Sequence, residues 1–141
     1  TATTQASATV SVTVPIAVTH VDGRALSFGT ITVGTGGKVK VNAAGVATFG
    51  GDVGEVTGSS TSADAFTVEG DPNRRFDIVT TDGRIRNGVD SMKFKTEASA
   101  DRGTLSSLGT ASFTVGGVLT VRGTESEGDY TGRYDARVTY D

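Results

Sequence analysis

The opening stretch alternates apolar and polar side chains over residues 1–18. Even-numbered positions are apolar except Thr4, whereas odd-numbered positions are mostly Thr, Ser and Gln. A period of two predicts a β-strand with one buried face. Seventeen extended residues would span about 56 Å, whereas a compact domain of this length is only about 37 Å across. The pattern therefore predicts a strand that is too long for its own domain.

The closing stretch, residues 128–141, alternates as strictly as the opening one. One face carries small and aromatic side chains, and the other carries charged residues and threonine. This pattern predicts a second long terminal strand. The residues of the apolar face are Tyr130, Gly132, Tyr134, Ala136, Val138 and Tyr140.

Short alternating segments separated by turn residues fill the middle of the chain. They predict strands over residues 26–33, 37–41, 43–50, 65–70, 74–83 and 91–98, and two more within 101–123. Gly45 and the pair Gly116-Gly117 are hairpin signals, and the tripeptide at residues 71–73 is a turn signal. Helical periodicity is absent, so the pattern predicts a single all-β domain, an antiparallel immunoglobulin-like β-sandwich.

Composition supports this prediction, because 45 of the 141 residues are Val, Thr or Ile, against four Leu and one Met. β-branched side chains suit a pleated sheet better than a helix. Two interpretations of the long opening strand remain open. It could bend at Pro15 and serve both sheets of a closed sandwich. Alternatively, residues 1–11 could add to the sheet edge of a neighbouring molecule, and repetition of that contact would give a filament.

The chemistry-bearing residues give little support to an enzyme. The formal net charge is −3 without a basic run, which argues against nucleic-acid binding, and no apolar stretch is long enough for membrane insertion. The chain has no cysteine and one histidine, His20, which we interpret as a surface or capping residue. We therefore expect no cofactor and no metal site. The acidic residues are expected to form turns: Asp64, Asp71, Asp77, Asp82, Asp90, Glu125, Glu127 and Asp129.

The two ends together resemble the subunits of chaperone–usher pili of Gram-negative bacteria. Those pilins end in an alternating apolar strand with a penultimate tyrosine and a glycine fourteenth from the end. Here Tyr140 is penultimate and Gly128 is fourteenth, and the opening stretch matches that family's N-terminal donor strand. Many such pilins carry a disulfide, so this chain resembles the cysteine-less branches. Its middle, with LSFGTITVG and AFTVEG, is similar to a family of secreted bacterial β-sandwich domains without an assigned function.

The resemblance implies the major structural subunit of a surface pilus, or fimbria, with an incomplete sandwich that a neighbour's donor strand completes. It divides the chain into a donor extension, residues 1–11, and a pilin-like domain, residues 12–141. The implied partners are identical subunits, a periplasmic chaperone and an outer-membrane usher, and the implied location is the cell surface. The start at Thr1 is expected to follow signal-peptide cleavage. The alternative is a self-complemented secreted β-sandwich that binds a glycan or a protein.

The resemblance also assigns residues to the two halves of the expected contact. The donor strand comprises Ala2, Thr4, Ala6, Ala8 and Val10. The acceptor groove, which is also the strand that the chaperone recognises, comprises Gly128, Tyr130, Gly132, Tyr134, Ala136, Val138 and Tyr140.

Overall fold

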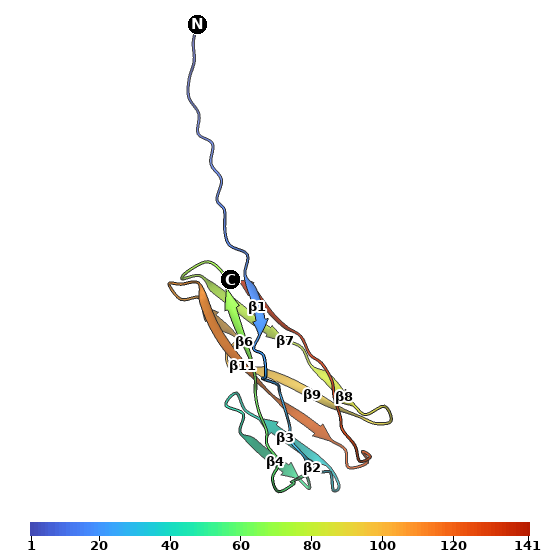
Figure 1. Cartoon of the computed structure of the whole chain (residues 1–141). Helices are drawn as coiled ribbons and strands as arrows, with labels where there is room; N and C mark the ends of the chain where they lie inside the picture. Colours follow the sequence, from blue (N-terminus) through green and yellow to red (C-terminus); the bar gives the residue numbers. More distant parts are fainter.

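A computed structural model describes residues 1–141 as an all-β chain without helices (Figure 1). It contains no helix that could cross a membrane. The strands are β1 (Ala17–His20), β2 (Ile31–Thr32), β3 (Gly37–Val41), β4 (Ala47–Gly51), β5 (Gly54–Glu55), β6 (Asp64–Glu69), β7 (Arg75–Thr80), β8 (Gly83–Arg86), β9 (Ser91–Ala98), β10 (Arg102–Thr104), β11 (Thr110–Val121) and β12 (Ala136–Tyr140).

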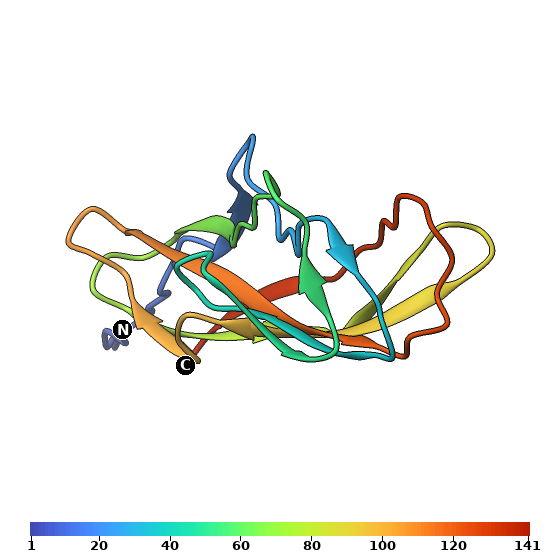
Figure 2. The same ribbon diagram turned by 90° about the horizontal axis from the view of Figure 1, so that it is seen from below.

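The strands form three antiparallel sheets, which confirms the all-β, antiparallel part of the predicted fold class. The largest sheet has seven strands in the order β1-β6-β11-β3-β4, with β9 on the other edge of β11 and β8 beside β9. A second sheet has the order β10-β7-β12, and β2 pairs with β5 in a third. Viewed from below, the body is elongated (Figure 2). Both chain termini lie at one end, and the loops that follow β8 and β11 lie at the other.

The predicted hairpin at Gly116-Gly117 is wrong, because β11 runs through both glycines without a turn. At this point the partner on one edge of β11 changes from β6 to β3, while β9 follows the opposite edge. A Cβ on Gly116 would overlap the carbonyl oxygen of Val41, and one on Gly117 would lie 2.5 Å from that of Lys95. The glycines therefore permit close packing of strands where the sheet divides.

Other local predictions have mixed outcomes. The hairpin through Gly45 is confirmed, because β3 and β4 pair across it and Gly45 adopts a positive φ of 85°. Strands also flank the turn at residues 71–73, as predicted. However, β6 pairs with β1 and β11, whereas β7 pairs with β10 and β12, so this turn carries the chain from one sheet to another.

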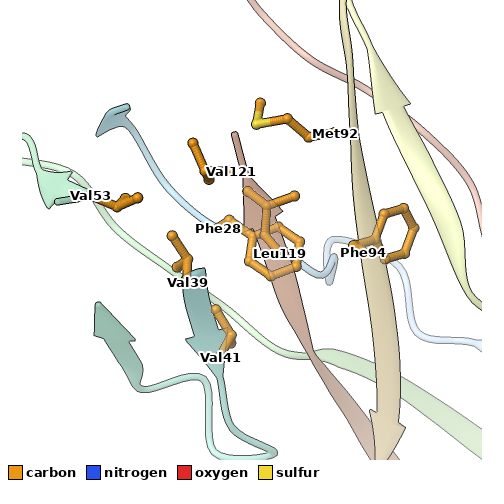
Figure 3. Packing of buried hydrophobic residues seen from close by; sticks show 8 residues of the cluster. All are labelled: Phe28, Val39, Val41, Val53, Met92, Phe94, Leu119 and Val121. Carbon is orange, nitrogen blue, oxygen red and sulfur yellow. The ribbon is translucent and has the colours of Figure 1, made fainter. Parts of the chain in front are cut away.

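Two clusters of buried apolar side chains form the core. The first lies under β3, β9 and β11 and is shown in Figure 3; it comprises Phe28, Val39, Val41, Val53, Met92, Phe94, Leu119 and Val121. The second lies toward the end of the body that holds the termini; it comprises Val68, Phe76, Ile78, Leu105, Phe113, Val115 and Val138. Valine is frequent in both clusters, so its branched side chain fills the space between the sheets.

The opening stretch does not form the long strand that its pattern predicts. Only residues 17–20 are in a strand, β1, which pairs with β6. Residues 1–15 are exposed and extend away from the body beside the C-terminus (Figure 1). Within this single chain no sheet edge lies alongside them, so the alternating pattern has no surface against which to bury its apolar face.

The closing stretch keeps its alternation but only partly forms a strand. β12 covers residues 136–140 and pairs with β7. Upstream, residues 128–135 lie outside the sheets, apart from one bridge between Arg86 and Thr131. Tyr130, Tyr134 and Val138 are at least partly buried, whereas their odd-numbered neighbours are exposed. The predicted apolar face is thus confirmed, but the strand is shorter than predicted.

Candidate functional site

A cleft of about 1160 Å³ separates two segments of low strand content, residues 25–33 and residues 125–135. These segments form its two walls. Side chains from β6, β8, β9 and β11 form its floor, and they include Phe66, Ile85, Met92, Phe94 and Leu119. Because several of these residues belong to the first core cluster, the cleft opens directly onto the core.

The C-terminal wall has an open strand edge. Thr131 exchanges backbone hydrogen bonds of 2.8 and 3.0 Å with Arg86, and the carbonyl of Asp135 accepts one of 2.9 Å from Thr81. Thr131 therefore turns its backbone toward β8, and Asp135 toward the end of β7, whereas Arg133 makes no backbone hydrogen bond. Alternate residues of an antiparallel strand bond to opposite neighbours. The backbone groups of residues 130, 132, 133 and 134 have no hydrogen-bond partner, and the alternation leaves those of residues 130, 132 and 134 available on the side of the cleft.

The opposite wall is built in the same way. Ser27 exchanges backbone hydrogen bonds of 2.9 and 3.1 Å with Ser62, on the side away from the cleft. The backbone N–H and C=O groups of Leu26 and Phe28 have no hydrogen-bond partner. Buried backbone groups are almost always paired in folded proteins. Two unpaired edges on either side of an apolar floor therefore leave space for one more strand.

Aromatic rings from both walls converge on the floor. The ring centroid of Phe94 lies 6.3 Å from that of Phe28 on one wall and 6.3 Å from that of Tyr134 on the other. Tyr134 also meets Phe66 edge to face at 6.4 Å. Such pairs are stabilising beyond the area they bury. These contacts hold the walls at a defined separation across the apolar floor.

One polar cluster interrupts this apolar surface. The carboxylate of Asp64, only 6% exposed, lies 2.5 Å from Nε2 of His20 and accepts a hydrogen bond of 2.7 Å from the Tyr134 hydroxyl. The backbone N–H of Ala65 also donates to it at 2.9 Å. Burial, together with the hydrogen bond to Asp64, raises the pKa of Tyr134. The ring of Tyr134 thus reaches from the C-terminal wall to β6.

This cluster corrects the expected role of Asp64. Asp64 is the buried first residue of β6 and not a turn former. The side chain of His20 is 45% exposed, which agrees with the expected surface location, and it also contacts Asp64. His20 lies 44 positions from Asp64 in the sequence and Tyr134 lies 70 positions from it, so no local pattern could join them.

A second carboxylate fixes the loop from which the C-terminal wall begins. Glu125 is buried and accepts hydrogen bonds of 2.8–3.0 Å from the backbone N–H groups of residues 122–124. Burial raises the pKa of this carboxyl, but these backbone bonds outweigh that effect and lower it. Asp90 accepts a 2.8 Å bond from the backbone of Ser126, which lowers the pKa of Asp90. Two ionised carboxylates therefore hold this loop in place.

Comparison with protein families gives a match over nearly the whole body. The matching family is a domain of unknown function, DUF4402, and the match covers residues 16–140. The chain belongs to the DUF4402 family. Comparison with curated proteins and with solved structures finds no match. The resemblance to pilins therefore rests on the two ends of this DUF4402 chain. The first fifteen residues precede the family match.

The predicted acceptor residues divide into two groups in the DUF4402 domain. Gly128, Tyr130, Gly132 and Tyr134 line the cleft. The others continue the same face along β12 and pack against the second core cluster; they are Ala136, Val138 and Tyr140. The sequence pattern predicted a strand over residues 26–33, but only β2, Ile31–Thr32, forms there, and the pattern gave no sign of an open cleft.

None of the predicted donor residues lies in the cleft of its own chain. The first hydrogen bonds between the extension and the body occur at Val14. Its N–H donates to the Asp71 carboxylate at 2.8 Å, and its carbonyl accepts from the Tyr140 hydroxyl at 2.5 Å. Tyr140 also accepts a 2.9 Å bond from the backbone of Asp71, and Arg74 stacks 3.9 Å above the Tyr140 ring. The penultimate tyrosine therefore anchors the base of the extension.

Proposed function

We propose that this chain is the major structural subunit of a bacterial surface pilus, which polymerises head to tail by donor-strand exchange. In this proposal residues 1–11 of one subunit occupy the cleft of the next. The observation that carries it is a coincidence of two deficits in one chain. An alternating segment has no sheet edge beside it, and a cleft with two open edges has no strand within it.

The two deficits are chemically complementary. Val10 and Val12 on the apolar face of the extension are 85% and 89% exposed, and burial of a valine side chain contributes about 1.5–3 kcal/mol. The cleft offers an apolar floor for that face. Its walls offer unpaired backbone groups at residues 26 and 28 and at residues 130, 132 and 134. Strand addition derives affinity from such backbone bonds and specificity from alternate side chains.

The placement of the two features favours contact between molecules. The extension leaves the body beside the C-terminus and points away from it (Figure 1). The cleft runs from His20 and Asp135 toward the loop at residues 122–128, at the opposite end of the body (Figure 2). Subunits stacked end to end could each place an extension in the cleft of the next subunit along. A contact of this kind does not close on itself, so it generates a filament.

The proposal includes assembly factors and a location, which rest on the resemblance to pilins. An open apolar cleft with unpaired strand edges promotes aggregation. A periplasmic chaperone would cover it by lending a strand beside residues 130–141, and an outer-membrane usher would exchange that strand for the neighbour's extension. In the filament, the added strand would complete an immunoglobulin-like sandwich. The subunits would then reside in a fimbria on the cell surface.

The test compares the full chain with a variant that lacks residues 1–11, each produced by cells with the assembly factors. Material sheared from the cells is run on a denaturing gel, unboiled and boiled. We expect the full chain to give a ladder that collapses to the 14.3 kDa monomer only on boiling. The deletion variant should give a folded subunit and no ladder. A monomer band in both lanes for the full chain would refute the proposal and favour a self-complemented domain that binds a glycan or a protein.

A further inference from the structure

One residue on the inward face of the extension is polar, whereas the others are apolar. This face carries alanine and valine at every even position from residue 2 to residue 12 except Thr4. Two buried polar side chains line the cleft: Glu125, whose carboxylate is bonded to the backbone at the start of the C-terminal wall, and Asp64, which contacts Tyr134 and His20 beside the apolar floor. We infer that the neighbour's extension occupies the cleft in a single register, with Thr4 over the polar cluster around Asp64. The inference rests on the proposed function.

The cluster has hydrogen-bonding capacity that a covering strand must satisfy. A carboxylate can accept about four hydrogen bonds, and Asp64 accepts three, counting the one from His20. The Tyr134 hydroxyl donates to Asp64 and can still accept a bond. An inserted strand removes water from both groups, and an unsatisfied buried polar group is costly. A threonine hydroxyl can donate and accept here, whereas alanine or valine can do neither.

The direction of insertion follows from where the extension enters. A neighbour positioned at the end of the body near residues 122–128 places the base of its extension there and its tip toward β12. The inserted strand therefore runs antiparallel to residues 128–136. With Thr4 opposite Tyr134, the residues that face each other in order are Ala6 and Gly132, Ala8 and Tyr130, and Val10 and Gly128.

This register also matches side-chain size along the cleft. The largest inward residue of residues 2–10, Val10, meets a glycine, and the small Ala8 meets the large ring of Tyr130. A slip of two residues keeps the same face inward. It would place Val10 opposite either Tyr130 or Ser126, and would move Thr4 away from the polar cluster. Size and polarity thus select the same pairing independently.

Engineered disulfides test the register, since the chain has no cysteine of its own. Gln5 and Arg133 are both exposed and lie opposite each other in this register. Directly opposed Cβ atoms are about 4.5–5.5 Å apart, and diagonal ones about 7–8 Å. A disulfide requires about 3.5–4.5 Å, so only a direct pair needs little adjustment. The test variant combines Gln5→Cys with Arg133→Cys, and matched controls combine Gln5→Cys with Thr131→Cys or Asp135→Cys.

We expect the Arg133→Cys combination to form covalent multimers under mild oxidation at least about tenfold faster than either control. The readout is a boiled, non-reducing gel of assembled filaments. Faster cross-linking in either control would overturn the register and leave the proposed function intact. If the unsubstituted chain forms no filaments at all, both proposals fail, so the two failures are distinguishable.

Substitution of Thr4 tests the polar contact separately. Thr4→Val keeps the shape of the side chain and removes its hydroxyl, and Thr3→Val makes the same change on the outward face. We expect Thr4→Val filaments to dissociate in detergent about tenfold faster than the unsubstituted ones, and Thr4→Ser and Thr3→Val filaments to be unchanged. Equal dissociation rates for Thr4→Val and Thr3→Val would overturn the assigned contact. Both positions lie outside the folded body, so folding of the subunit is not at stake.

Discussion

The two ends of this chain share one sequence pattern and have opposite surroundings. Val138, on the apolar face of the last strand, is 8% exposed, whereas Val10, on the apolar face of the first stretch, is 85% exposed. Both residues sit in strict apolar–polar alternation. Such a pattern therefore specifies which face of a segment is suited to burial, but it does not specify which surface will bury that face.

The difference arises from the neighbours that each end finds. β12 lies beside β7, which supplies its ladder, and the second core cluster lies beneath it. Residues 1–13 make no hydrogen bond with the rest of the chain. One hydrogen bond joins the two ends, from the Tyr140 hydroxyl to the Val14 carbonyl. The last strand therefore anchors the first stretch without burying it.

The largest expected effect comes from a charge on the inward face of the extension. Val10→Asp should abolish detergent-resistant filaments, because a carboxylate would have to enter an apolar cleft without a partner. Thr9→Asp is the matched control on the outward face and should assemble normally. Unboiled gels of sheared material measure the difference. Normal filaments from Val10→Asp would mean that even-numbered residues do not face the cleft.

The second effect compares the same substitution at the two ends. Val138→Ala removes buried methyl groups and should lower the free energy of unfolding of the isolated subunit by about 1–3 kcal/mol. Val10→Ala removes exposed groups and should change it by less than about 0.5 kcal/mol. Urea unfolding followed by circular dichroism gives both values. Similar losses for the two variants would show that the extension packs against its own subunit.

A smaller effect is expected where the ends touch. Tyr140→Phe removes the hydroxyl that bonds Val14 and Asp71, and should lower the free energy of unfolding by about 0.5–1.5 kcal/mol. It should also speed hydrogen exchange at the Val14 amide, because the bond of this amide to the Asp71 carboxylate depends on the Tyr140 hydroxyl holding the Val14 carbonyl in place. Tyr130→Phe, which removes a hydroxyl bonded to Ser126 instead, serves as the control and should leave that amide unaffected. Unchanged exchange in Tyr140→Phe would mean that the hydroxyl does not anchor the extension.

The smallest effect concerns the loop that begins the C-terminal wall. The pKa of Glu125 is lowered in the folded state, so its ionised form stabilises the fold above its ordinary pKa of 4.5. This contribution is lost progressively as the pH falls below that value. Glu125→Gln should flatten the decline in stability below about pH 4.5, as measured by thermal unfolding at several pH values. The opening stretch, residues 1–18, contains no acidic residue and therefore contributes nothing to this decline. An identical decline in both proteins would exclude this role of Glu125.

The fold was predictable wherever a single local pattern decided the outcome. Alternation and β-branched composition are local properties, so the all-β class, the hairpin at Gly45 and the buried face of residues 130–140 followed from the sequence. Pairing between distant strands is not local. The glycines at positions 116 and 117 therefore suggested a turn, although they serve the crossing of β3, β9 and β11.

The candidate site shows the same division. The C-terminal wall was expected from the alternation that ends at Tyr140. The opposite wall, at residues 25–33, and the contacts of Asp64 with His20 and Tyr134 depend on how the sheets are arranged. Acidic residues occur in turns so often that Asp64 carried no distinguishing signal. Its burial results from its pairing with Val115 of β11 and its contacts with His20 and Tyr134, which only the folded chain establishes.

The anchoring of Val14 by Tyr140 has a mechanical consequence in the proposed filament. A pulling force would enter each subunit through its extension at Val14 and divide there, one part following the backbone into β1 and the other passing through the Tyr140 hydroxyl into the last strand. It would leave through residues 130–134, which hold the extension of the next subunit. The closing stretch, residues 130–140, would therefore carry part of the tension along the body. Because the inserted strand lies along the direction of pull, its hydrogen bonds would be loaded together in shear and would resist rupture as a group.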